Sequence, residues 1–133
     1  MDAIEYLKFK DEFKDRVFSL IKECFLDVKF NGTNINDAYI AVINDKVIGH
    51  ISYQVLKDPY KGDIAYISYV CTKKEYRNKG VAHNLLKIVE KELKTKNIHR
   101  IMLTSSYDRI IAHKLYLSCG YIKKESDIFI KNI

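Results

Sequence analysis

Two different hydrophobic periods follow one another at the start of the chain. Residues 4–9 alternate apolar and polar side chains, which is the period of a half-buried strand. From Asp11 to about residue 27, apolar side chains recur at helical spacing, at Phe13, Val17, Leu20, Ile21, Cys24 and Phe25. This spacing predicts an amphipathic helix, for which Asp11 is a suitable N-cap.

Strand-forming residues dominate the middle of the chain. Residues 38–43 and 46–56 predict two strands, and the tight connection Asn44-Asp45 between them indicates a hairpin. Residues 64–72, rich in Tyr, Ile and Val, predict a central strand. Turn-forming residues at 31–34 and 58–63 separate these elements.

Helical and strand patterns alternate in the second half. One apolar stripe, formed by Val81, Leu85, Val89 and Leu93, predicts a helix that packs on the sheet. Residues 98–104 predict a strand, residues 108–118 a helix ended by Gly120, and residues 121–122 and 128–130 short closing strands. The order β-α-β-β-β-α-β-α-β-β predicts an α/β fold in which helices flank a mixed sheet.

Length and composition fit one globular domain over residues 1–133. The 133 residues are 47% hydrophobic and 30% charged, and no run of eighteen apolar residues predicts a transmembrane helix. Residues 1–5 lack the pattern of a secretory signal. The three cysteines, Cys24, Cys71 and Cys119, are an odd number without C-x-x-C spacing, which favours reduced core thiols. We therefore expect a cytoplasmic protein that does not bind a membrane.

A net charge of +6 by itself admits nucleic acid, an anionic membrane surface or a polyphosphate ligand as a partner. Lysine and arginine are dispersed, which makes nucleic acid the less favoured choice, and their densest cluster surrounds Gly80. The four histidines fall on different predicted elements without ligand spacing, so we expect no metal.

The segment around Gly80 predicts an anion site. It lies where a strand passes into a helix, so the first backbone N–H groups of that helix are unpaired and face outward. Gly80 permits a close approach of the backbone, and Arg77 and Lys79 add cationic donors.

These residues resemble the GNAT superfamily of N-acetyltransferases. The family signature R/Q-x-x-G-x-G/A is matched by Arg77, Gly80 and Ala82, directly after a strand and at the start of a helix. A late helix with leucine-tyrosine shortly before glycine-aromatic is matched by Leu115-Tyr116 and Gly120-Tyr121. The order of elements also agrees, so the resemblance covers essentially the whole chain.

The resemblance implies that two central parallel strands splay apart to admit acetyl-coenzyme A (acetyl-CoA). They would be the strand ending near Thr72 and the strand at residues 98–104. The backbone of Val70, Cys71 and Thr72 would bind the pantetheine arm. The pyrophosphate would lie on the amides of the turn, with Arg77 beside it; the turn residues are Asn78, Lys79, Gly80, Val81 and Ala82.

The resemblance also implies roles for residues on the late helix. Tyr116 matches the family tyrosine that protonates the departing thiolate, and a phenol with a pKa of ~10 can donate to a thiolate whose acid has a pKa of about 8.5. Arg109 either contacts coenzyme A or anchors the helix. His113 is expected to be structural or to hydrogen-bond the neighbouring loop, rather than to act as a catalytic base.

The general base stays unassigned, because Tyr69 stands where many relatives carry a glutamate. Four nearby residues could relay a proton through water: Ser68, Tyr66, Tyr69 and His50. We expect acetyl transfer to the primary amine of a small molecule. Alternatives are a protein lysine or N-terminus as acceptor, or a catalytically silent nucleic-acid or protein-binding module. A homodimer is left open.

Overall fold

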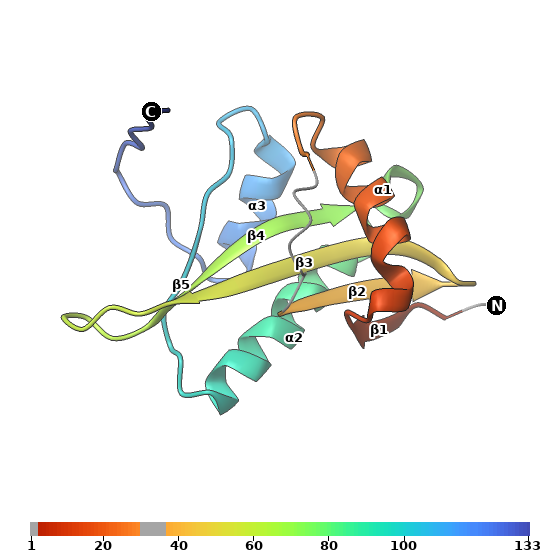
Figure 1. Cartoon of the computed structure of the whole chain (residues 1–133), viewed down its shortest axis with the longest axis horizontal. Helices are drawn as coiled ribbons and strands as arrows, with labels where there is room; N and C mark the ends of the chain where they lie inside the picture. Colours follow the sequence, from red (N-terminus) through yellow and green to blue (C-terminus); the bar gives the residue numbers. More distant parts are fainter. Residues whose placement is uncertain (1–2, 30–36) are drawn as a thin grey trace.

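The computed structural model describes residues 3–29 and 37–133. At its centre is one twisted five-stranded sheet (Figure 1). The strands lie in the order of the chain: β1 (Glu5–Lys8), β2 (Ala38–Ile43), β3 (Lys46–Leu56), β4 (Ile64–Thr72) and β5 (Ile101–Leu103). Neighbours are antiparallel except β4 and β5, which are parallel. The mixed sheet of the sequence-based prediction is confirmed.

The helices cover both faces of the sheet. The helix α1 (Lys14–Cys24) packs on one face, while α2 (Val81–Thr95) and α3 (Ile110–Ser118) lie on the other (Figure 1). Two buried clusters result, one beneath α1 and a larger one beneath α2 and α3. Because β4 contributes Cys71 to the first cluster and Val70 to the second, its end is held from both sides.

The apolar stripe of α2 is confirmed, because all four of its predicted residues are buried. At the first of them the helix comes unusually close to the sheet. A Cβ added to Gly49 of β3 would lie 2.6 Å from Cγ1 of Val81, closer than two such atoms can approach. Glycine at this position therefore allows the start of α2 to rest on the strand.

Several predicted boundaries were wrong. Asp11 does not cap a helix through its side chain; it begins the 3-10 turn η1 (Asp11–Phe13), and α1 starts only at Lys14. The strand predicted at residues 98–104 is reduced to β5, because β4 offers it partners only at Ala65, Tyr66 and Ile67. The late helix starts at Ile110, two residues after the predicted start.

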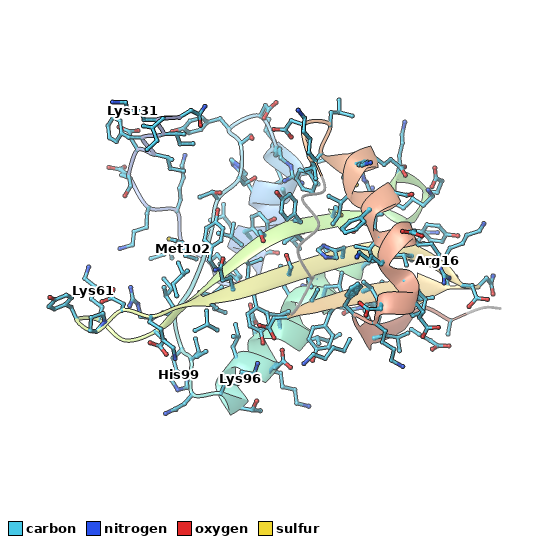
Figure 2. The ribbon with its side chains drawn as sticks, in the orientation of Figure 1. Arg16, Lys61, Lys96, His99, Met102 and Lys131 are labelled. Atoms are coloured by element: carbon cyan, nitrogen blue, oxygen red, sulfur yellow. The ribbon has the colours of Figure 1, made fainter. Side chains whose placement is uncertain are left out.

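The two short strands predicted at residues 121–122 and 128–130 are absent. Residues 121–133 have no regular structure, and Lys131 lies apart from the sheet and the helices (Figure 2). A strand requires a neighbour that supplies its hydrogen bonds, and none pairs with this segment. The side chains of Ile128, Phe129 and Ile130 are consequently exposed.

The turn predicted at residues 31–34, and the acceptor-side loop to which it would belong, lie outside the described residues. Within the described ranges, no helix is both long enough and apolar enough to span a membrane.

Candidate functional site

The end of β4 has a free edge on the side of β5. Parallel pairing stops at Ile67↔Leu103, although β4 continues to Thr72. In the described part of the chain, Ser68, Cys71 and Thr72 are therefore paired with β3 alone, and the edge of β4 towards β5 is open beyond Ile67. Val70, Cys71 and Thr72, which were expected to bind the pantetheine arm, all lie on this edge.

An irregularity in β4 interrupts that edge at Tyr69. The register between β3 and β4 shifts between His50 and Ser52, and Tyr69 has a φ of 51° in the left-handed region. This conformation is a strained one for a bulky side chain. His50 lies opposite, with its Nδ1 atom 2.8 Å from the carbonyl oxygen of Tyr69.

Beyond Thr72 the chain forms a turn that ends in the first residue of α2. It contains the 3-10 turn η2 (Lys74–Tyr76), which the sequence did not predict, and two left-handed residues, Asn78 (φ 64°) and Gly80 (φ 79°). Arg77 fixes the turn to β4, because its Nε donates to the carbonyl oxygen of Thr72 over 3.0 Å. The ammonium of Lys79 lies 5.4 Å from the centre of the Tyr76 ring.

This turn has the properties of an anion cradle. No side chain of the described residues caps the start of α2, and its first turn carries no acidic residue. In the described part of the chain, the amides of Val81 and Ala82 have no hydrogen-bond acceptor. A Cβ placed on Gly80 would meet no atom within 4 Å, so a ligand can approach the backbone here. The geometry therefore fits a pyrophosphate.

Tyr116 of α3 lies in the same core cluster as Val70 and is only 7% exposed. Burial raises the pKa of its phenol, while the charge of Arg109 opposes the shift. The ring packs at an angle against Tyr121, with centroids 6.1 Å apart. Its hydroxyl bonds to no other described residue, and because the pKa is raised it stays protonated at neutral pH.

Arg109 precedes α3 and reaches the end of α1. Its guanidinium lies 5.3 Å from the ring centre of Phe25, which in turn packs edge-on against Tyr69 at 5.4 Å. Figure 1 shows the loop before α3 beside the end of α1, across the open end of β4. Sequence reasoning missed Phe25 as a site residue, since it completes the apolar spacing of the helix.

A pair of thiols lies beside the end of β4. The thiols of Cys24 and Cys71 are in hydrogen-bond contact, and this contact with the help of Arg77 lowers the pKa of Cys24 to about 7, against the effect of burial. The same contact, together with burial, raises the pKa of Cys71. Cys71 is a buried core residue as expected, whereas Cys24 is half-buried and more acidic than a core thiol.

The proposed proton-relay residues lie on the α1 face of the sheet. The hydroxyls of Ser52 and Ser68 are 3.1 Å apart, and the hydroxyl of Tyr66 is 2.9 Å from Oγ1 of Thr104. His50, unlike the hydroxyl-bearing residues, carries an imidazole, and burial lowers its pKa to about 4. His113 hydrogen-bonds the carbonyl oxygen of Ser106 over 2.8 Å, which confirms the expected contact with the loop. The described residues contain no cluster that could hold a metal ion.

Known proteins resemble this chain in sequence and in fold. Residues 4–121 match the model of the acetyltransferase (GNAT) family. Streptothricin acetyltransferase of Escherichia coli is 29% identical over 91 residues, which are 68% of this chain and 50% of that protein. The chain thus spans about half the length of this curated relative.

Two solved structures share the fold. The aminoglycoside N-acetyltransferase AAC(6')-Iy in complex with CoA superposes with a TM-score of 0.84 at 15% identity, over 99% of this chain and 96% of that one. A protein from Clostridium acetobutylicum, described as a predicted acetyltransferase with acetyl-CoA, gives a TM-score of 0.78 at 20% identity, over 97% and 96% of the two chains.

Proposed function

Because the chain belongs to the acetyltransferase (GNAT) family, we propose that it transfers the acetyl group of acetyl-CoA to the primary amine of a small molecule. The amine attacks directly, in a complex that contains both substrates. Streptothricin acetyltransferase and the aminoglycoside acetyltransferase are named for small-molecule acceptors, which supports this choice over a protein acceptor.

One arrangement carries the proposal. The free edge of β4 leads directly into the turn in which the amides of Val81 and Ala82 have no acceptor among the described residues, and Tyr116 shares a buried cluster with Val70 of that edge. A long ligand with a pyrophosphate at one end and an amide-containing arm at the other matches these two features together. The arm would add to β4 as a further strand does, through the backbone of Val70, Cys71 and Thr72.

The pyrophosphate would bind at the start of α2. The amides from Asn78 to Ala82 would supply hydrogen bonds, and the helix dipole favours negative charge at this end. Arg77 has one guanidinium nitrogen committed to Thr72, which leaves the others for phosphate oxygens. Lys79 adds a second positive charge next to Gly80.

In the reaction, the nitrogen of the amine forms a bond to the acetyl carbon and the bond from that carbon to sulfur breaks. A backbone N–H near residues 70–72 would stabilise the negative charge on the carbonyl oxygen. Tyr116 would donate its proton to the departing thiolate, for which its protonated state is required.

The amine must lose a proton before or during attack. His50 is poorly suited to take it, because its pKa is about 4 whereas that of an alkylammonium is ~10.4. The hydroxyls of Ser68 and Tyr66 lie on the α1 face of β4 and would pass the proton to water. Arrival of the amine in its neutral form would remove the need for a base.

Thermal melting with acetyl-CoA tests the donor site. At one hundred times the dissociation constant, binding adds about 2.7 kcal/mol and raises Tm by several degrees. Pantetheine, which lacks the pyrophosphate, is the control ligand and should give a smaller shift. No shift with acetyl-CoA would rule out the proposed function.

Release of free thiol across a panel of amines tests the acceptor. The panel contains polyamines, aminoglycosides, amino acids, aminoalkylphosphonates and peptides. Thiol release with peptides alone would favour a protein acceptor. Binding of RNA or DNA that weakens with salt, without any affinity for acetyl-CoA, would instead favour the binding-module alternative.

A further inference from the structure

Three residues from three elements form a stack at the open end of β4. They are Arg109 before α3, Phe25 after α1 and Tyr69 at the irregularity of β4. The guanidinium lies over the face of the Phe25 ring, and the Tyr69 ring braces Phe25 at 86°. An arginine held by one face keeps the N–H groups around its rim available for hydrogen bonds.

The guanidinium of Arg109 has no acidic partner in the part of the chain that the structure describes. No ion pair and no side-chain hydrogen bond joins it to residues 3–29 or 37–133. It is nevertheless half-buried, and its charge opposes the rise in the pKa of both Tyr116 and Cys71. Among the described residues this cation thus has no acidic partner, and it lies near Tyr116 and Cys71.

The neighbouring surface on the α1 face of β4 carries hydroxyl groups. Its side-chain contacts are between hydroxyls, Ser52 with Ser68 and Tyr66 with Thr104, and no described carboxylate takes part in them. An acceptor with several positive charges would need carboxylates to pair with it. A hydroxyl-lined surface with one free guanidinium is instead complementary to an acceptor that carries an oxyanion.

The cations expected to bind the pyrophosphate lie on a different element from Arg109. Arg77 and Lys79 lie on the turn before α2, and Arg77 is tied to the last residue of β4. Arg109 is tied to Phe25 and Tyr69, on the face of β4 that carries the relay hydroxyls. This difference favours the acceptor over the coenzyme as the partner of Arg109.

We propose that Arg109, held on Phe25, binds an acidic group of the acceptor, so that the substrate is a small amine carrying a carboxylate or a phosphonate. This inference rests on the proposed acetyl transfer. Binding of the acid group at Arg109 fixes the amine at one end, which holds its nitrogen near the acetyl carbon. Arg109 would then decide which amines are acetylated, without a part in the proton transfers.

Matched amines test this choice. The probes are 3-aminopropanoate and 2-aminoethylphosphonate, each compared with propylamine, which lacks the acid group. Thiol release should give a kcat/KM at least 30-fold higher for one of the acidic amines. The carboxylate and phosphonate arms then separate the two kinds of acid.

Variants connect the preference to the residue. Arg109→Gln should lower kcat/KM for the preferred acidic amine about 10- to 100-fold and leave propylamine within 3-fold, with the KM for acetyl-CoA unchanged. Arg109→Lys should recover part of the loss. Arg100→Gln is the matched control, because that guanidinium holds the carbonyl oxygens of Lys61 and Gly62, which belong to the loop before β4.

Three outcomes would overturn the inference. In the first, the acidic amines are turned over no faster than propylamine. In the second, Arg109→Gln raises the KM for acetyl-CoA and leaves the KM for the acceptor unchanged. In the third, the protein binds acetyl-CoA and acetylates none of the acidic amines. In the last case an acetylated neutral or cationic amine would leave the proposed function intact. Absence of any acetyl-CoA binding would contradict both the proposed function and the role of Arg109.

Discussion

The imidazole of His50 donates a hydrogen bond from Nδ1 to the carbonyl oxygen of Tyr69, over 2.8 Å. His50 is 1% exposed, and burial lowers its pKa to about 4, so the ring is neutral. With the proton on Nδ1, the other nitrogen, Nε2, is buried and has no partner among the described residues. The bond holds Tyr69 in its left-handed conformation, and with it the strand edge where the acetyl group is proposed to lie.

Replacement of His50 tests this bond. His50→Leu removes the donor and leaves the carbonyl of Tyr69 unpaired, which should cost about 1–3 kcal/mol of unfolding free energy. His50→Asn can place an amide N–H where Nδ1 was. We expect kcat to fall at least 10-fold in the leucine variant and to recover substantially in the asparagine variant, with the KM for acetyl-CoA little changed in both. Equal turnover by the two variants would exclude a positioning role.

The same histidine predicts a loss of stability in acid. Its pKa is about 4 in the folded protein and ~6.5 in an unfolded chain, so the unfolded state binds more protons between these values. The contribution of neutral His50 is therefore complete above pH 6.5 and is lost as the pH falls towards 4, by at most about 1.4 kcal/mol per pH unit. Urea unfolding at pH 7, 6 and 5 should show a shallower decline for His50→Asn, while the exposed-site variant His99→Asn should follow the wild type.

Tyr116→Phe separates binding from chemistry. The hydroxyl of Tyr116 bonds to no described residue, so its removal should leave both Tm and the shift caused by acetyl-CoA nearly unchanged. Loss of the proton donor should lower kcat about 100-fold. Tyr121→Phe is the control, since it removes a 3.0 Å bond to Glu90 and should affect stability more than turnover. Wild-type turnover in Tyr116→Phe would remove the assigned role.

Gly80 can be compared with a second glycine in the same conformation. Gly80 (φ 79°) and Gly62 (φ 86°) are both left-handed, and an added Cβ meets no atom within 4 Å at either position. Alanine should therefore cost each site a similar ~1 kcal/mol through backbone strain alone. Only Gly80→Ala should also weaken acetyl-CoA binding, measured by calorimetry, because it disturbs the amides of the turn. Equal affinity in the two variants would place the pyrophosphate elsewhere.

Gly49→Ala tests how the donor site is supported. The new Cβ would be 2.6 Å from Val81 and 3.2 Å from both Ala41 and Leu85, so the start of α2 must shift. We expect a loss of about 1–3 kcal/mol in unfolding free energy, together with weaker acetyl-CoA binding. Adding Val81→Ala should restore part of both, by removing the atom in closest contact. Purely additive losses in the double variant would contradict this explanation.

The features that the sequence predicted are those that local pattern determines. The stripe of α2 and the turn at Gly80 follow from side-chain spacing and from the needs of a helix start, and both were found. The prediction of closing strands at residues 121–122 and 128–130 was wrong, because β-propensity does not supply a pairing partner. The conformation of Tyr69 could not be predicted, since tyrosine gives no signal of a positive φ. The stack of Arg109 on Phe25 joins residues 84 positions apart in the sequence, which no local pattern reveals.

Gly49 and His50 are consecutive residues of β3, and their side-chain positions point to opposite faces of the sheet. Gly49 sets how closely the start of α2 approaches, while His50 sets the shape of β4 at Tyr69. The pairing register of β3 thus sets the positions of both ends of the proposed donor site, although β3 is not expected to touch the ligand. A single residue inserted into the Asn44-Asp45 hairpin, shifting the pairing by one, would turn histidine towards α2 and glycine towards Tyr69. A change in the length of this hairpin that shifts the register would therefore alter both ends of the site at once.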